Sequence, residues 1–193
     1  HARREGAHSL ARLQLLLLQH PQQRLEVLEC ALRFTRNNRF EVDYDDFEAK
    51  CADEKTTVFL LCNPHNPTGR VWTADELQRM NDICLRHDVR VVSDEIHCEL
   101  VMPGYHFSPF ATVSDACRDN AIILNSPSKS FNIAGLQVAN IICNNHRINN
   151  CTIYWCFNLY SINSWFRLDI SRLLYYRAIS TLLKSSLNGG RHD

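Results

Sequence analysis

Four short apolar runs in the middle of the chain show the pattern of buried β-strands. Each holds four to eight residues and is rich in Val, Ile, Leu or Cys. Runs of this length, bounded by turn-forming residues, predict strands that are covered on both faces. The runs cover Thr56 to Cys62, Val89 to Ser93, Ala121 to Leu124 and Leu136 to Cys143.

Between the first two runs the pattern changes to that of an amphipathic helix. Thr73 followed by Glu76 is the sequence signature of a capping box at a helix N-terminus. Apolar residues then recur at helical spacing as far as His87, which predicts a helix over about 74–87. Strands that alternate with a helix favour an α/β fold with a mainly parallel sheet flanked by helices.

Polar motifs follow three of the predicted strands directly. They are Asn63 to Gly69, Asp94 to His97 and Ser126 to Asn132. In a parallel sheet, ligands bind beyond the carboxyl ends of the strands. If the three strands are parallel neighbours, the motifs meet at one edge of the sheet, and we expect a binding site there.

Each motif taken alone also has a structural explanation. The first, N-P-H-N-P-T-G, is rich in turn formers. An aspartate at a strand end, such as Asp94, is more often a capping or solvated carboxylate, and an isolated Lys129 is typical of a solvated surface. Ser126 and Ser128 are ordinary loop residues. The functional interpretation therefore depends on the three motifs acting together.

Together the motifs supply what one cofactor requires. Pyridoxal 5'-phosphate needs a lysine for a Schiff base, a carboxylate beside the pyridine nitrogen, a donor near the ring oxygen and groups for its phosphate. Lys129 is the candidate amine, both nucleophile and later base. Asp94 is the candidate partner of the pyridine nitrogen. Asn66 is suited to the ring oxygen, and Ser126 to the phosphate.

Three segments in this order resemble the fold-type I pyridoxal-phosphate enzymes of aminotransferase class I/II, in particular their cystathionine β-lyase branch. The segments are N-P-H-N-P-T-G-R-V-W, V-V-S-D-E-I-H-C-E-L and S-P-S-K-S-F-N-I-A-G-L-Q. The resemblance implies the large domain of the pyridoxal-phosphate-dependent transferase-like fold. It also implies that pyridoxal 5'-phosphate binds Lys129 covalently and contacts five further residues: Asn66, Asp94, His97, Ser126 and Ser128.

Two positions distinguish branches of this superfamily. Many aminotransferase relatives carry a tyrosine three residues after the aspartate, where this chain has His97, and an arginine eight residues after the lysine, where it has Gln137. Both differences indicate the lyase branch. A partly buried histidine without a catalytic part is an equally good reading of His97.

The resemblance implies β-elimination from cystathionine or another cysteine S-conjugate, with release of a thiol, pyruvate and ammonia. The implied partner is therefore a small sulfur-containing amino acid, and the full-length family implies a homodimer. Transamination shares the early steps and is the alternative reaction. Two alternatives of another class are a truncated, inactive fragment and an α/β domain that kept the motifs without the chemistry.

The resemblance covers about residues 36–144, and family members are considerably longer. We therefore expect a partial pyridoxal-phosphate-binding large domain at 36–145, between an unassigned N-terminal segment at 1–35 and an unassigned C-terminal segment at 146–193. No family motif surrounds the arginines of the last segment. The chain is expected to be the middle of a longer protein.

Charge and cysteine content narrow the partners and the location. Twenty-one basic and 21 acidic side chains give zero formal charge, which argues against nucleic-acid binding or a membrane-surface patch. The leucine run from Leu10 to Leu18 is too short to span a bilayer. Nine scattered cysteines without a C-x-x-C pair predict reduced thiols and a cytoplasmic, disulfide-free chain.

Overall fold

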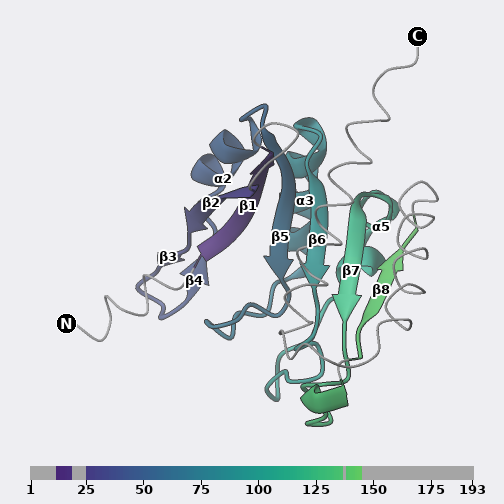
Figure 1. Cartoon of the computed structure of the whole chain (residues 1–193). Helices are drawn as coiled ribbons and strands as arrows, with labels where there is room; N and C mark the ends of the chain where they lie inside the picture. The colour runs from purple at the N-terminus through teal and green to yellow at the C-terminus, as the bar shows by residue number, and fades with distance from the viewer. Residues whose placement is uncertain (1–11, 19–24, 137, 145–193) are drawn as a thin grey trace.

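The computed structural model describes residues 12–18, 25–136 and 138–144. Its main element is a six-stranded sheet with the order β2-β1-β5-β6-β7-β8 (Figure 1). The strands are β1 (Arg12–Leu18), β2 (Leu25–Ala31), β5 (Thr56–Cys62), β6 (Arg90–Asp94), β7 (Ala121–Asn125) and β8 (Asn140–Cys143). A separate hairpin pairs β3 (Arg33–Phe34) with β4 (Phe40–Glu41).

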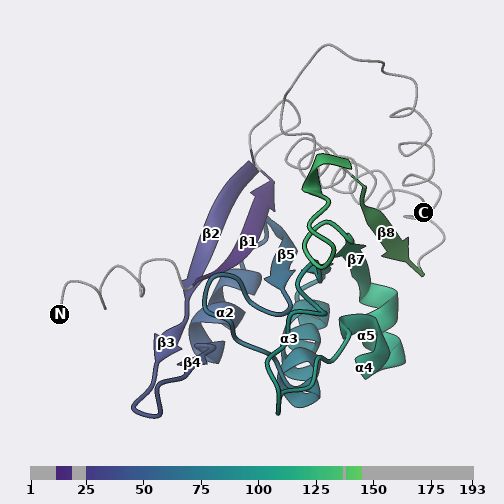
Figure 2. The ribbon, with the colours of Figure 1, turned by 90° about the horizontal axis from the view of Figure 1, so that it is seen from below.

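The described α-helices lie together on one face of the sheet, as Figure 2 shows. They are α2 (Tyr44–Cys51), α3 (Ala74–Arg86), α4 (Phe110–Val113) and α5 (Asp115–Asn120), and a short 3-10 helix, η1 (Ala134–Leu136), follows β7. Alternate strand residues such as Phe59, Leu61 and Val91 are buried against these helices. The core therefore lies between the central strands and the helical layer.

Parallel pairing is confirmed for the three central strands and is confined to them. β5 pairs in parallel with β6, and β6 with β7, whereas the pairs β1–β2, β1–β5 and β7–β8 are antiparallel. Six residues connect β1 to β2, which is too short for the crossover that parallel neighbours need. The α/β sheet is thus mixed, with a parallel centre and antiparallel edges.

Helix α3 matches its sequence prediction to within one residue. The Thr73 hydroxyl accepts a hydrogen bond from the Glu76 N–H at 3.2 Å, and the Glu76 carboxylate accepts one from the Thr73 N–H at 2.9 Å. This capping box satisfies two backbone donors that would otherwise lack partners. The apolar face of the helix, including Leu77 and Met80, is fully buried.

Two expectations about element limits change. The strand expected from Leu136 begins only at Asn140, because Leu136 belongs to η1 and is 67% exposed. The sheet also begins before residue 36, since β1 and β2 are part of it. The division at 36–145 stays a prediction, and residues 146–193 lie outside the described part of the chain.

The described residues give two further facts about environment. None of their helices is long and apolar enough to cross a membrane. The seven cysteines that the structure describes are all free, and four of them are buried: Cys30, Cys51, Cys84 and Cys117.

Candidate functional site

The three polar motifs meet at one edge of the sheet, as expected. Strands β5, β6 and β7 run in the same direction and end together, at the lower side of Figure 1. Backbone hydrogen bonds continue past the strand ends: the Asn63 N–H donates to the Asp94 carbonyl at 2.9 Å, and the Glu95 N–H donates to the Leu124 carbonyl at 2.8 Å. The starts of the first two motifs are therefore fixed against the neighbouring strand.

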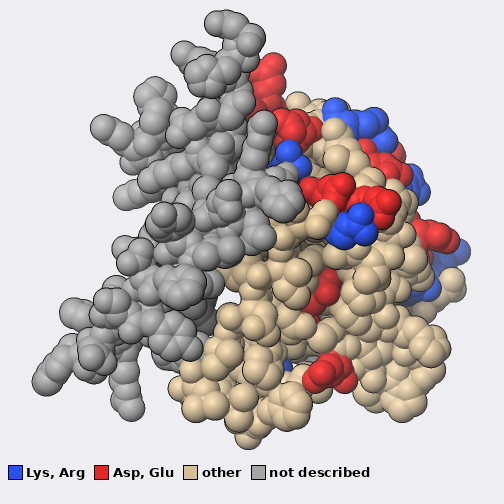
Figure 3. Space-filling view, turned by 90° about the vertical axis from the view of Figure 1, so that its right-hand side faces the viewer, with Lys and Arg blue, Asp and Glu red and all other residues tan. Residues whose placement is uncertain are grey.

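Figure 3 shows one face of the molecule beside this edge. On that face charged side chains gather mostly in the upper part, while the lower part, toward which β5 to β7 run, shows mostly uncharged surface.

Asp94 and Lys129 lie close enough to influence each other. Burial raises the pKa of the Asp94 carboxyl above its ordinary value of 3.8, while the Ile96 N–H, His97 and Lys129 act to lower it. The Ile96 N–H donates to Asp94 Oδ1 at 3.2 Å. Asp94 is partly buried and Lys129 is exposed. The edge thus combines a half-buried carboxylate with an accessible amine.

Asn66 comes from the loop after β5 and is exposed. Its backbone N–H acts to lower the pKa of Cys62, but burial and the negative charge of Asp94 outweigh it and raise that pKa to about 11. Cys62 is therefore a neutral thiol at neutral pH, between the Asn66 backbone and Asp94. The Asn66 side-chain amide is left on the solvent side of this loop.

Ser126 and Ser128 form one local cluster after β7. Ser126 Oγ donates to the Val138 carbonyl at 2.6 Å, accepts from the Ser128 N–H at 3.1 Å, and lies 2.9 Å from Ser128 Oγ. A hydroxyl has one proton to donate. In this conformation the Ser126 proton closes the loop onto Val138, so the phosphate contact that the resemblance implies requires it to turn.

A cavity of about 620 Å³ opens beside the strand ends. Its walls are the hairpin turn 37–40, the loop 64–71 and the segment 97–105. Asn66 and the partly buried His97 line it, whereas Asp94, Ser126, Ser128 and Lys129 do not. The predicted residues therefore form two groups at one edge. Gln137, the other position used to distinguish the branches, lies outside the described residues.

Glu95 is an additional residue that the sequence analysis did not single out. Its side chain is 4% exposed, and Oε1 accepts hydrogen bonds from Ser93 Oγ at 3.0 Å, the Phe110 N–H at 2.9 Å and Asn63 Nδ2 at 3.4 Å. Burial raises the pKa of Glu95, and these donors partly offset the increase. The signal was present in the acidic pair 94–95, because neighbouring residues at a strand end face opposite sides.

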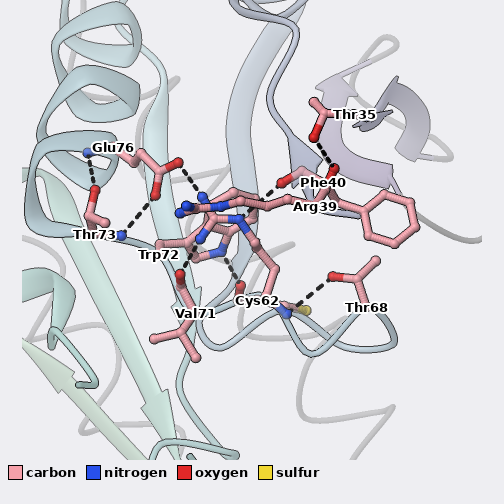
Figure 4. A network of polar contacts seen from close by, with 10 residues as sticks. Thr35, Arg39, Phe40, Cys62, Thr68, Val71, Trp72, Thr73 and Glu76 are labelled. Atoms are coloured by element: carbon pink, nitrogen blue, oxygen red, sulfur yellow. Dashed lines mark hydrogen bonds and ion pairs between the residues drawn. The ribbon is translucent and has the colours of Figure 1, made fainter. Parts of the chain in front are cut away.

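The loop after β5 is also anchored at its far end, by Arg70. Its Nε donates to the Phe40 carbonyl at 2.9 Å, and its terminal nitrogens bind the Val71 carbonyl and the Glu76 carboxylate (Figure 4). The guanidinium carbon lies 4.8 Å from the ring centroid of Trp72. Arg70 thereby joins the loop to α3 by an ion pair and to β4 by a hydrogen bond, and its guanidinium also lies over the Trp72 ring.

The family model that matches this chain is aminotransferase class I and II, over residues 23–188. The chain belongs to this family. The match includes all three motifs at the strand ends and extends to both sides of the region on which the resemblance was based.

Named relatives agree with the family. The chain is 46% identical to cystathionine beta-lyase PatB of Bacillus subtilis over 107 residues, which are 55% of this chain and 28% of PatB. It is similar to the crystal structure of cystalysin from Treponema denticola, which contains a pyridoxal 5'-phosphate cofactor, with a TM-score of 0.59 and 41% identity over 62% of this chain and 30% of cystalysin.

A third relative is the PLP-bound C-S lyase from Staphylococcus hominis. The TM-score is 0.58 with 35% identity, over 73% of this chain and 34% of that one. The fold of the described residues is therefore that of pyridoxal-phosphate-dependent proteins. The chain spans about a third or less of the length of each of these three relatives.

Proposed function

We propose that this chain is part of a pyridoxal-phosphate-dependent carbon–sulfur β-lyase that acts on cystathionine or another cysteine S-conjugate. The observation that carries the proposal is that an exposed Lys129 lies close enough to a half-buried Asp94 to act on its pKa, at the carboxyl edge of three parallel strands. Membership of aminotransferase class I and II and the similarity to a cystathionine beta-lyase support the choice of cofactor and reaction.

The residues at the edge fit the chemistry of the cofactor. Lys129 would hold the carbonyl carbon, Asp94 would stabilise the proton on the pyridine nitrogen, and Asn66 would donate to the ring oxygen. Ser126 and Ser128 would bind the phosphate, and His97 would complete the contacts from the side of the cavity. When bound, pyridoxal 5'-phosphate supplies an electron sink that stabilises negative charge at the substrate Cα.

The protein's own groups then have definite tasks. The Lys129 amine, once free, takes the proton from the substrate Cα as a general base. The C–S bond at Cβ breaks with its electron pair leaving on sulfur, and a proton from the same amine or from water converts the thiolate to a thiol. Hydrolysis of the remaining three-carbon unit gives pyruvate and ammonia.

The proposal extends to partners and location. The substrate is a small sulfur-containing amino acid, and the full-length protein forms a homodimer. The location is the cytoplasm, because seven described cysteines are free and reduced thiols persist in that compartment. No role for nucleic acid or a membrane enters the proposal.

Cofactor binding is tested by absorbance. The purified chain is titrated with pyridoxal 5'-phosphate, and a visible absorption band is expected to develop. Borohydride then removes the band and fixes the cofactor to the chain by a stable C–N bond. Lys129→Ala is expected to abolish the band, while Lys55→Ala, which removes an exposed lysine away from the edge, leaves it unchanged. A folded chain without the band, or a Lys129→Ala variant that retains it, contradicts the cofactor assignment.

The reaction is tested separately by its product. The cofactor-loaded chain is incubated with cystathionine, and pyruvate is measured with and without an added 2-oxo acid. Pyruvate without the 2-oxo acid is expected for β-elimination. A cofactor band with no pyruvate overturns the lyase assignment and leaves cofactor binding intact, and turnover that requires the 2-oxo acid indicates transamination instead.

A further inference from the structure

The cavity beside the strand ends has the size and the lining of a small-molecule site. Its volume of about 620 Å³ lies within the usual range for such sites. Among the described residues that line it there is no Asp or Glu. The titratable residues in its walls are cationic or can become so, apart from Tyr105: Arg39, His65, Arg70 and His97. The lining therefore favours an anionic group.

Only one of the two arginines has donors to spare. Arg70 is 7% exposed, and its guanidinium already binds the Phe40 and Val71 carbonyls and Glu76. Arg39 is exposed, and no ion pair of its side chain occurs among the residues that the structure describes. Burial lowers the pKa of Arg70, the Glu76 carboxylate acts to raise it, and the charge of Arg39 acts to lower it, so Arg39 lies close enough to influence Arg70.

The backbone that carries Arg39 is held in place. The Arg39 carbonyl accepts hydrogen bonds from the Thr35 N–H at 2.8 Å and from Thr35 Oγ1 at 3.1 Å, as Figure 4 also shows for the hydroxyl. Asn38, just before it, takes a left-handed conformation with φ of 55°. The turn between β3 and β4 thus presents Arg39 from a fixed position at the cavity.

Another part of the cavity wall is apolar and accessible. Leu100 is 55% exposed, Met102 71% and Tyr105 66%. Such side chains suit an alkyl or thioether chain. Asn66 and His97, which belong to the proposed reaction centre, line the same cavity. One continuous space therefore joins the proposed reaction centre, an apolar wall and a guanidinium that forms no ion pair with the residues the structure describes.

We infer that this cavity receives the part of the substrate beyond its sulfur atom, and that Arg39 binds a carboxylate at the end of that part. The inference rests on the proposed function and names its substrate class: cysteine thioethers whose leaving group ends in an anion. An exposed ion pair of this kind favours the acidic substrate by about fivefold.

The test compares two ligands that differ only in that carboxylate. S-(2-carboxyethyl)-L-cysteine and S-propyl-L-cysteine are titrated by calorimetry into the chain without cofactor, so that neither ligand is consumed. The acidic ligand is expected to bind about fivefold more tightly. Arg39→Gln is expected to remove this preference and Arg39→Lys to keep part of it. Arg36→Gln, which removes a neighbouring exposed arginine outside the cavity, leaves it unchanged.

Three outcomes overturn the inference. The first is equal affinity for the two ligands. The second is a preference for the acidic ligand that survives Arg39→Gln in a folded variant. The third is a loss of pyridoxal-phosphate affinity in Arg39→Gln, because this would assign the guanidinium to the cofactor phosphate. Absorbance at the cofactor band separates this test from that of the proposed function. A ligand preference in a chain that never forms the band supports the cavity assignment and contradicts the lyase.

Discussion

Two of the three loops that carry the candidate site, those after β5 and β7, are held in different ways. The first loop, residues 63–70 after β5, is tied to distant elements: Asn63 binds Glu95 and the Ser108 carbonyl, and Arg70 binds Glu76. The lysine loop, residues 126–136 after β7, relies mostly on bonds within itself, such as that from the Phe131 N–H to the Pro127 carbonyl at 3.0 Å.

Burial follows the same division. In the first loop Asn63, His65 and Arg70 are between 0% and 7% exposed. In the lysine loop Lys129 is exposed and Phe131 is 67% exposed. The comparison teaches that buried polar contacts hold the first loop in a fixed orientation at the strand ends. The amine proposed to react, that of Lys129, lies instead on a loop with little tertiary burial.

The largest expected effect is the loss of the anchor of the first loop. Arg70→Met removes the donor to the Phe40 and Val71 carbonyls and the ion-pair partner of Glu76, whose carboxylate keeps its hydrogen bond from the Thr73 N–H, and we expect a loss of about 3 kcal/mol in unfolding free energy. Urea denaturation measures it, with Arg36→Met as an exposed control. A loss below about 0.5 kcal/mol would show that the anchor does not hold the frame.

Glu95 is the second anchor, with a smaller expected effect. Glu95→Ala leaves three donors unpaired, on Asn63, Ser93 and Phe110, and should cost about 2 kcal/mol, whereas Glu95→Gln keeps an acceptor and should cost less. Equal losses in the two variants would contradict the role of the acceptor. The measurement is urea denaturation at neutral pH.

The same residue gives a prediction about pH. Because burial raises the pKa of Glu95 above its ordinary value of 4.5, the folded chain binds this proton more readily than the unfolded chain. Its contribution to stability is therefore present at low pH and is lost as pH rises through the folded pKa. The stability of the parent relative to Glu95→Gln should increase as pH falls toward 4.5, and a constant difference would contradict the assignment.

His97 affects the candidate site without anchoring the frame. Burial raises the pKa of Asp94, and the charge of His97 partly offsets this increase. His97→Asn should therefore raise that pKa further and move the acidic limit of cofactor binding, the lowest pH at which the cofactor band forms, to higher pH. Absorbance of the cofactor band against pH measures the limit, and urea denaturation should show little change. A limit that moves to lower pH would exclude this electrostatic link.

The smallest effect is expected in the lysine loop. Phe131→Ser replaces a side chain that is 67% exposed, and the unfolding free energy should change by about 0.5 kcal/mol or less. A loss comparable with that of Arg70→Met would remove the difference between the two loops.

Local patterns in the sequence predicted several elements correctly. The capping box, the apolar face of α3 and the apolar runs of β5, β6 and β7 are each encoded within a few residues, so their limits agree to within one residue. The meeting of the motifs at one edge followed from the general geometry of parallel strands.

Contacts between distant residues could not be predicted in this way. Arg70 reaches Phe40, 30 residues away, and Asn63 reaches Ser108, 45 residues away. The antiparallel part of the sheet also depends on which strand lies beside which: β1, from the leucine run in the segment that the sequence analysis left unassigned, lies between β2 and β5. The roles assigned to individual site residues remain predictions.

The most direct measurement of the central claim is the position of the cofactor on the chain. The chain has four lysines, Lys50, Lys55, Lys129 and Lys184. After incubation with pyridoxal 5'-phosphate and reduction by borohydride, proteolysis and mass spectrometry identify which lysine carries the pyridoxyl group. The account predicts labelling of Lys129 far above the other three at low cofactor concentration. Equal labelling of all four lysines, or preferential labelling of another, would contradict it.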